Sequence, residues 1–188
     1  QGRVKVRHFV RVLYEDIGNE KIKDRVVKDL SSFLLASHYG CHYLKPSDIY
    51  DDFDDPENPK SLDTLIRATG AQIVEYEDKK GCCGNVILGV DEDISLAIAK
   101  QKLDHVSLSG PDALVLLCPA CGLQLDNFQR KIEVNFGADY KLPILYYPQL
   151  LGLALGRKPE ELGLDMNRVS VDELLKKVMN KQKNEGKH

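Results

Sequence analysis

The chain has 188 residues, which is enough for one domain that buries its own core without disulfide bonds. With 43% hydrophobic and 29% charged residues, its composition excludes the fibrous and disordered classes. The formal net charge of -3 argues against nucleic-acid binding, which needs clustered positive charge. No apolar run reaches the ~18 residues that span a membrane, and no signal-peptide pattern opens the chain. We therefore expect an intracellular, cytoplasmic protein.

Residues 1–30 are expected to form a helical arm that acts as a linker. Apolar residues recur at three- and four-residue spacing from Val6 to Leu30, as they do in amphipathic helices. The chain begins with Gln1 and not with Met, so we interpret it as a piece of a longer protein. On this interpretation the arm connects to a preceding domain that the present sequence does not include.

Strands and helices are expected to alternate after the arm. The clearest strand, Ala113–Leu117, is an uninterrupted apolar run that ends at Cys118. The alternation predicts an α/β fold, with a parallel sheet of about four strands and helices on both of its faces. In the helix expected after the second strand, Ile94, Ala97 and Ile98 should face the core. The expected strands are residues 32–37, 71–77, 113–117 and 143–147, and the expected helices are residues 62–68, 91–105, about 119–136 and 150–155.

We divide the chain into the arm, a cysteine-rich domain at residues 31–175 and a polar, lysine-rich tail at residues 176–188, which is expected to fray. An acidic loop from Asp48 to Pro59 follows the first strand of the domain. This loop lacks the glycine and glutamate positions of an EF-hand. Its charge is therefore interpreted as solvated surface and not as a calcium site.

Five cysteines are the most informative residues of the chain. Their number is odd and two of them are adjacent, which does not suit a secreted disulfide framework. In a reducing compartment, clustered cysteines more often bind metal or carry out redox chemistry. Cys41 follows the first expected strand, Cys82 and Cys83 follow the second, and Cys118 and Cys121 follow the third. Because the carboxyl ends of parallel strands share one edge of a sheet, we expect all five to converge there.

Thiolates favour zinc or iron-sulfur clusters, whose common sites use no more than four protein ligands. Only Cys118 and Cys121 have the C-x2-C spacing of a zinc site. The adjacent cysteines suit a larger cluster, since Gly81 and Gly84 on either side allow close backbone approach. Two alternatives stay open: Cys118 and Cys121 form a thioredoxin-like redox pair, or the cysteines are simply buried apolar residues.

The order C-x40-CC-x34-C-x2-C resembles the cysteine-rich CCG domain found in the B-type subunit of heterodisulfide reductase and in its relatives. These relatives include iron-sulfur subunits of glycolate and lactate oxidoreductases, thiol:fumarate reductase and an archaeal succinate dehydrogenase subunit. The segments HYGCH (38–42), DDPENP (54–59), ATGA (68–71), CCG (82–84) and CPAC (118–121) look most like the second, C-terminal copy of the domain in the heterodisulfide reductase protein. The resemblance covers nearly the whole chain.

The resemblance implies that Cys41, Cys82, Cys83, Cys118 and Cys121 hold one noncubane 4Fe-4S cluster, built of fused smaller iron-sulfur units. It also implies reductive cleavage of a disulfide such as that of coenzyme M and coenzyme B, a reaction of methanogenesis. The expected partners are the preceding CCG domain of the same chain, the other subunits of the reductase complex and the disulfide substrate. We expect no nucleic acid, no membrane span and no turnover by the isolated fragment.

Two histidines lie in the HYGCH segment. Cleavage of a disulfide to two thiols takes up two protons, and imidazole side chains can supply protons near neutral pH. His42, which follows Cys41, is the candidate catalytic proton donor, with a turn residue bonded to backbone as the alternative. We interpret His38 as a residue that orders the turn. The alternative is that His38 is itself a metal ligand or donates a hydrogen bond to one.

Two further functions stay open at this point. The domain can instead be a zinc-binding CCG assembly module, and isolated or air-exposed protein can carry zinc, a partial cluster or disulfides. It can equally be the electron-transfer subunit of a related succinate, glycolate or lactate oxidoreductase. Metal analysis separates the first of these from the cluster.

Overall fold

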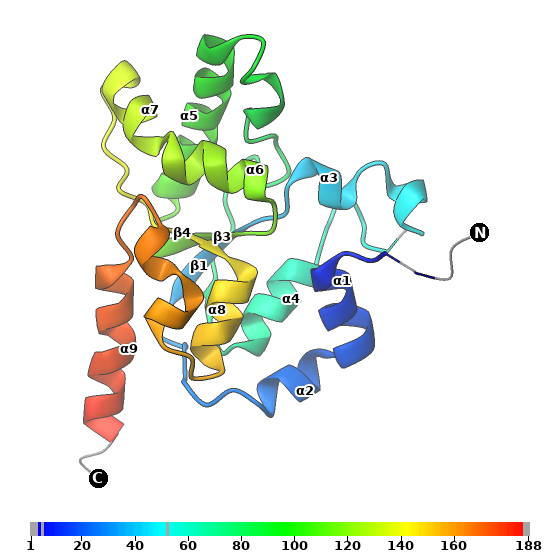
Figure 1. Cartoon of the computed structure of the whole chain (residues 1–188), viewed down its shortest axis with the longest axis vertical. Coiled ribbons are helices and arrows are strands. Elements are labelled where there is room, and N and C mark those ends of the chain that lie inside the picture. Colours follow the sequence, from blue (N-terminus) through cyan, green and yellow to red (C-terminus); the bar gives the residue numbers. More distant parts are fainter. Residues whose placement is uncertain (1–3, 5, 52, 186–188) are drawn as a thin grey trace.

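The computed structural model describes residues 4, 6–51 and 53–185 of the chain. This part of the chain has a four-stranded sheet with the order β2-β1-β3-β4, in which every neighbouring pair of strands is parallel (Figure 1). The expectation of an α/β fold with a parallel sheet is therefore confirmed. The strands are β1 (Leu34–His38), β2 (Gln72–Ile73), β3 (Ala113–Leu116) and β4 (Ile144–Tyr146).

The α-helices differ in length and are joined by short 3-10 and π turns. The helix α5 (Glu92–Leu108) begins after Asp91, whose side chain accepts a hydrogen bond from the Ile94 N–H at 3.0 Å. The helix α7 (Gln129–Phe136) ends at Gly137, which adopts the left-handed conformation that stops helices. The others are α1 (Phe9–Val12), α2 (Asn19–Lys23), α3 (Cys41–Leu44), α4 (Ser61–Ala68), α6 (Pro119–Gly122), α8 (Tyr147–Ala154) and α9 (Asp172–Glu185).

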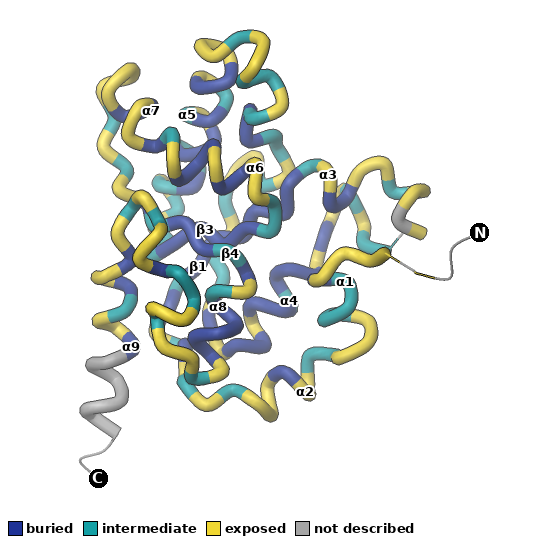
Figure 2. The backbone as a smooth tube through the Cα atoms, in the orientation of Figure 1, coloured by how far each residue is buried: buried dark blue, intermediate teal, exposed yellow. Residues whose placement is uncertain are grey.

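The core occupies both faces of the sheet, because successive residues of a strand point to opposite sides. On one face, Leu35 and Val115 are buried in a cluster with residues of α4, α8 and the arm. On the other face, Ala36 and Leu114 are buried with residues of α5 and α7. Figure 2 shows the dark-blue buried backbone of the strands at the centre of the molecule. Both faces are covered, as the apolar run of the third strand predicts.

The arm is helical from Phe9 to Lys23, where Gly18, with a φ of 80°, divides it. Residues 24–30 are not helical, so the helix expected to continue to Leu30 was wrong there. Val10, Ile22 and Leu30 are buried in the same cluster as α4 and α8. The arm therefore contributes to the core of this domain and does not merely lead to it.

Three details differ from the sequence expectation. The second strand spans only Gln72–Ile73, whereas residues 71–77 were expected. The last hydrogen bond of this segment to β1 runs from the Val74 N–H to the Leu35 carbonyl, and beyond it the chain leaves the sheet. The buried side of α5 includes Ser95 and Leu96 and not Ile94, which is half-exposed, so the expected inward face was wrong. The hydroxyl of Ser95 donates to the Gly84 carbonyl and sets this rotation of the helix. The helix α9 continues into the polar segment 176–188, as far as residue 185.

No helix in the described part of the chain combines the length and the apolar character that crossing a membrane requires.

The contribution of the arm to the core gives a stability prediction. Ile22 is 4% exposed and Ile49 is 68% exposed. Ile22→Ala should lower the free energy of unfolding by about 2–5 kcal/mol, because it leaves a cavity among packed side chains. The matched control Ile49→Ala should change it by less than about 0.5 kcal/mol. Denaturant unfolding measures both, and equally small effects would mean that the arm does not pack as described.

Candidate metal centre

Three cysteines meet where the two central strands end. Cys41 begins α3 after β1, Cys118 precedes α6 after β3, and Cys121 lies within α6. Gly40, with a φ of 77°, lies between them: a Cβ atom there would be 3.4 Å from the Cβ of Cys118 and 3.5 Å from the Sγ of Cys121. Position 40 therefore favours glycine both for its backbone conformation and for the close approach of the two thiols.

The adjacent cysteines reach the same place from the loop between β2 and α5. The thiol of Cys82 interacts with that of Cys41, and the thiol of Cys83 is hydrogen bonded to that of Cys121. Cys121 is in turn hydrogen bonded to Cys118. All five are free thiols. These pairwise contacts lie at the edge of the sheet that the sequence predicts, and among the described residues the group compact enough to hold a metal ion consists of Cys83, Cys121 and His38.

The electrostatics of the buried pair are asymmetric. This pair consists of Cys83 and Cys121. The hydrogen bond between the two thiols lowers the pKa of Cys83 and raises the pKa of Cys121. Burial raises the pKa of Cys82, although the Gly84 N–H donates to its sulfur at 3.3 Å and opposes this effect. The hydrogen bond therefore favours a buried pair with one ionised and one protonated thiol.

His38 joins the cysteines, although its neighbour in the same segment, His42, was the favoured candidate. His38 ends β1, is 1% exposed, and has a ring nitrogen within 4.8 Å of the sulfurs of Cys83 and Cys121. Neither of its ring nitrogens has a hydrogen-bond partner of normal geometry among the described residues, although the imidazole is near enough to Cys83 to help lower the pKa of that thiol. His42 is exposed on the first turn of α3. The signal for His38 in the sequence was its position as the last residue of a strand that leads to a cysteine.

The donor set at this edge fits a soft metal centre. Thiolate and imidazole are the ligands that zinc and iron prefer in proteins. A buried imidazole without a hydrogen bond is costly unless another group satisfies it, and a metal ion or a cluster sulfide would do so. The residues present therefore fit the metal centre that the resemblance implies.

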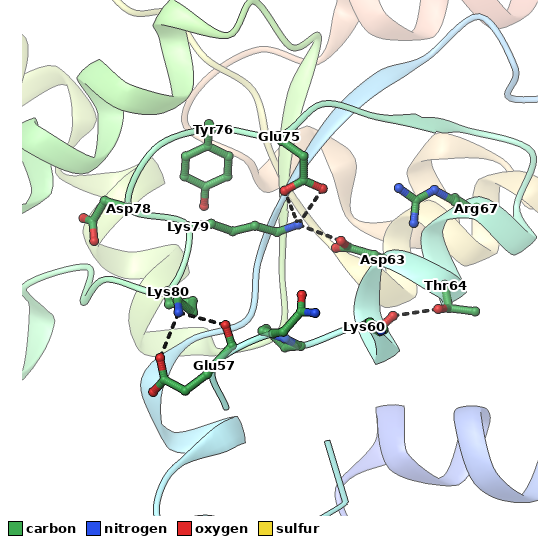
Figure 3. Close-up of a pocket in the computed structure, with 12 residues that line it drawn as sticks. Glu57, Lys60, Asp63, Thr64, Arg67, Glu75, Tyr76, Asp78, Lys79 and Lys80 are labelled. Atoms are coloured by element: carbon green, nitrogen blue, oxygen red, sulfur yellow. Dashed lines mark hydrogen bonds and ion pairs between the residues drawn. The ribbon is translucent and has the colours of Figure 1, made fainter. Parts of the chain in front are cut away.

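The loop that leads to the adjacent cysteines also forms one wall of a charged pocket of about 550 Å³ (Figure 3). The ammonium group of Lys79 lies 2.6 Å from Asp63 on α4 and 3.1 Å from Glu75. Lys80 pairs with Glu57 at 2.9 Å. The ion pair between Lys79 and Asp63 therefore holds the loop against α4, and the charges that line the pocket neutralise one another.

Comparison with protein families identifies the class of this domain. Residues 35–126 match the sequence profile of the family described as CCG, cysteine-rich domain. This range contains all five cysteines and His38. Over these residues the chain is similar to the cysteine-rich CCG family.

Comparison with individual proteins makes the relationship more specific. The chain is 41% identical over 180 residues to the B-type subunit of ferredoxin:CoB-CoM heterodisulfide reductase of Methanosarcina mazei, with 95% of this chain and 59% of the relative covered. It is 33% identical over 174 residues to the 8-methylmenaquinol:fumarate reductase membrane anchor subunit of Wolinella succinogenes, with 93% and 60% covered. The resemblance to the family of heterodisulfide reductase B-type subunits is confirmed, and the chain spans 59% of the length of the first of these relatives.

A solved structure supports the fold alone. The crystal structure of a hypothetical protein from Helicobacter pylori matches with a TM-score of 0.61 at 19% sequence identity. The match covers 81% of this chain and 28% of that one.

The backbone next to the cysteines gives a second stability prediction. Gly84 has a φ of 87°, and a Cβ atom there would lie 2.5 Å from the Ser95 carbonyl oxygen. Gly84→Ala should therefore lower the free energy of unfolding by at least about 1–2 kcal/mol, the cost of a left-handed residue with a side chain. Gly89→Ala is the control, since a Cβ atom at position 89 meets nothing within 4 Å. Equal denaturation midpoints for the two variants would contradict the described loop.

Proposed function

We propose that this chain is an iron-sulfur domain of an oxidoreductase complex, and that its five cysteines hold one noncubane 4Fe-4S cluster. The observation that supports the proposal most is the chain of pairwise contacts among the thiols at one edge of the sheet, from Cys41 to Cys82 and from Cys83 through Cys121 to Cys118. A single zinc ion uses four ligands, whereas a larger cluster can use a fifth. The relatives named as reductase subunits support the same role.

We propose further that the reaction is the reductive cleavage of a disulfide such as that of coenzyme M and coenzyme B. The cluster, when bound, supplies electrons to the disulfide. Two electrons and two protons convert one disulfide to two thiols, so the chain has to provide a path for protons as well. His42 is exposed next to Cys41 and is the proposed proton donor, while the burial of Cys83, Cys121 and His38 keeps water from the inner side of the centre.

The proposed partners follow from the length of the relatives. Since the segments around the cysteines look most like the second copy of the domain, we propose that this chain, which spans 59% of the Methanosarcina mazei protein, is the C-terminal CCG domain of a heterodisulfide reductase B-type subunit. A preceding CCG domain of the same protein and the other subunits of the complex would complete the active site. The isolated chain should then bind metal without turning over the disulfide. Free thiols in this number suit a reducing compartment, so we place the protein in the cytoplasm.

The cluster proposal is tested by anaerobic reconstitution of the chain with iron and sulfide. Iron and labile sulfide content, together with the EPR spectrum, should be lost when any one of the five cysteines is replaced by serine, because each supplies a ligand. Ala120→Ser is the control, since it adds a hydroxyl to the exposed residue between Cys118 and Cys121. Full iron content in the Cys83→Ser variant would reject the five-cysteine site.

A zinc-binding assembly module is the second candidate, and His38 favours it. Its ring nitrogen and the sulfurs of Cys83 and Cys121 lie within 4.8 Å of one another. This separation is close to the distance of about 3.8 Å between two sulfurs that bind one tetrahedral zinc ion. In the same preparations, a zinc site built on these residues should lose its metal in His38→Ala and retain it in Cys41→Ser. If Cys118 and Cys121 instead form a thioredoxin-like redox pair, Cys41→Ser should leave the redox activity of the pair unchanged.

The role of His42 is tested in the full-length protein with its partner subunits. His42→Gln should slow disulfide reduction about 100-fold, the usual contribution of a general acid, without changing the iron content. Lys45→Gln alters another exposed residue of the same segment and should leave the rate unchanged. An unchanged rate in His42→Gln would assign the proton to another group.

A further inference from the structure

Lys102 is a fully buried lysine next to the loop that carries the adjacent cysteines. Its side chain, on α5, is 0% exposed. Lysine is almost never buried to this extent unless its charge is paired, because removing an ammonium group from water is costly. A buried lysine therefore requires an explanation from its contacts.

Both of the residues that the Lys102 ammonium group contacts lie in this loop. The group donates a hydrogen bond to the backbone carbonyl of Asp78 and lies 3.5 Å from the Asp78 carboxylate. It also lies 5.5 Å from the centre of the Tyr76 ring, within the range of a cation–π interaction. The hydroxyl of Tyr76 donates to the Ser37 carbonyl at 3.0 Å, directly before His38. These contacts join α5 to the loop and to the end of β1.

The turn that Lys102 contacts ends directly before Cys82. Asp78 has a φ of 59°, and its carbonyl also accepts a hydrogen bond from the Gly81 N–H at 2.9 Å. The Asp78 carboxylate occupies the place of a side chain at position 81, since a Cβ atom there would lie 2.2 Å from its oxygens. The position of Cys82 and Cys83 therefore depends on a turn whose closing acceptor, the Asp78 carbonyl, also binds Lys102.

The charge of Lys102 also acts on the two thiols. Burial lowers the pKa of Lys102, and the negative charges of Asp78, Cys83 and Cys82 oppose this effect. Charges interact more strongly in a buried environment than in water. A positive charge near an iron-sulfur cluster favours its reduced, more negative form, since net charge is one of the factors that set the potential.

We propose that Lys102 is a positioning residue for the metal centre: it fixes the Asp78–Gly81 turn that presents Cys82 and Cys83, and its buried charge makes the bound cluster easier to reduce. The second half of this proposal rests on the proposed cluster. The first half concerns the loop itself and holds whichever metal is bound.

The positioning role is tested by amide hydrogen exchange on the metal-free chain. Lys102→Met should raise the exchange rates of Gly81 and Gly84 about tenfold, because their N–H groups donate to the Asp78 carbonyl and to the Cys82 sulfur in the loop that Lys102 holds. Lys102→Arg should restore protection. Lys100→Met is the control, because its side chain is 33% exposed on the same helix and pairs with Asp104. Exchange rates in Lys102→Met equal to those of Lys100→Met would overturn the proposal.

The electrostatic role is tested by EPR-monitored redox titration of the reconstituted chain. Lys102→Met should lower the midpoint potential, whereas Asp78→Asn should raise it, because the lysine charge is then less compensated. Shifts of the same sign, or no shift in either variant, would overturn this role. If Lys102→Met does not fold, Lys102→Gln takes its place, because it removes the charge but keeps a donor for the Asp78 carbonyl. A wild-type chain that takes up no cluster would refute the proposed function and this half of the inference, and the exchange rates would still decide the positioning role.

Discussion

The parallel pairing of β1 with β3 is the constraint on which the metal centre depends. Because the register places His38 opposite Leu116, the chain leaves both strands at the same level of the sheet. The two connections therefore begin side by side, and Gly40 lies in contact distance of the cysteines that follow β3. A change of one residue in this register would turn alternate side chains to the opposite faces and separate the thiols.

The second requirement is to hold a cysteine-bearing loop against this edge. The strand β2 contributes little, since it spans only Gln72–Ile73. Two lysines act in its place: Lys79 ties the loop to Asp63 on α4, and Lys102 ties it to α5 from the other side. The charge of Lys102 also interacts with Cys82 and Cys83, and a cation that is shielded from water offsets negative charge more effectively than a solvated one. The same contacts thus fix the geometry of the loop and its charge.

The sequence predicted the features that depend on local pattern. The apolar run at residues 113–117 identified a central strand, and the position of each cysteine after a strand predicted the convergence, because parallel strands share an edge. The end of β2 was not predictable, since it depends on the contact of Tyr76 with Ser37 across the loop. Proximity in the sequence favoured His42, whereas the fold brings His38 to the thiols. The burial of Lys102 depends on Asp78, 24 residues away, and no local pattern reports such a pair.

The central claim is that this edge of the sheet holds one iron-sulfur cluster and not a single ion. Native mass spectrometry of the chain, purified without oxygen, tests this claim most directly because it weighs the bound group itself. The account predicts an added mass equal to about four iron and four sulfide ions per chain, lost together on acidification. An added mass of one zinc ion, with no labile sulfide, would contradict it.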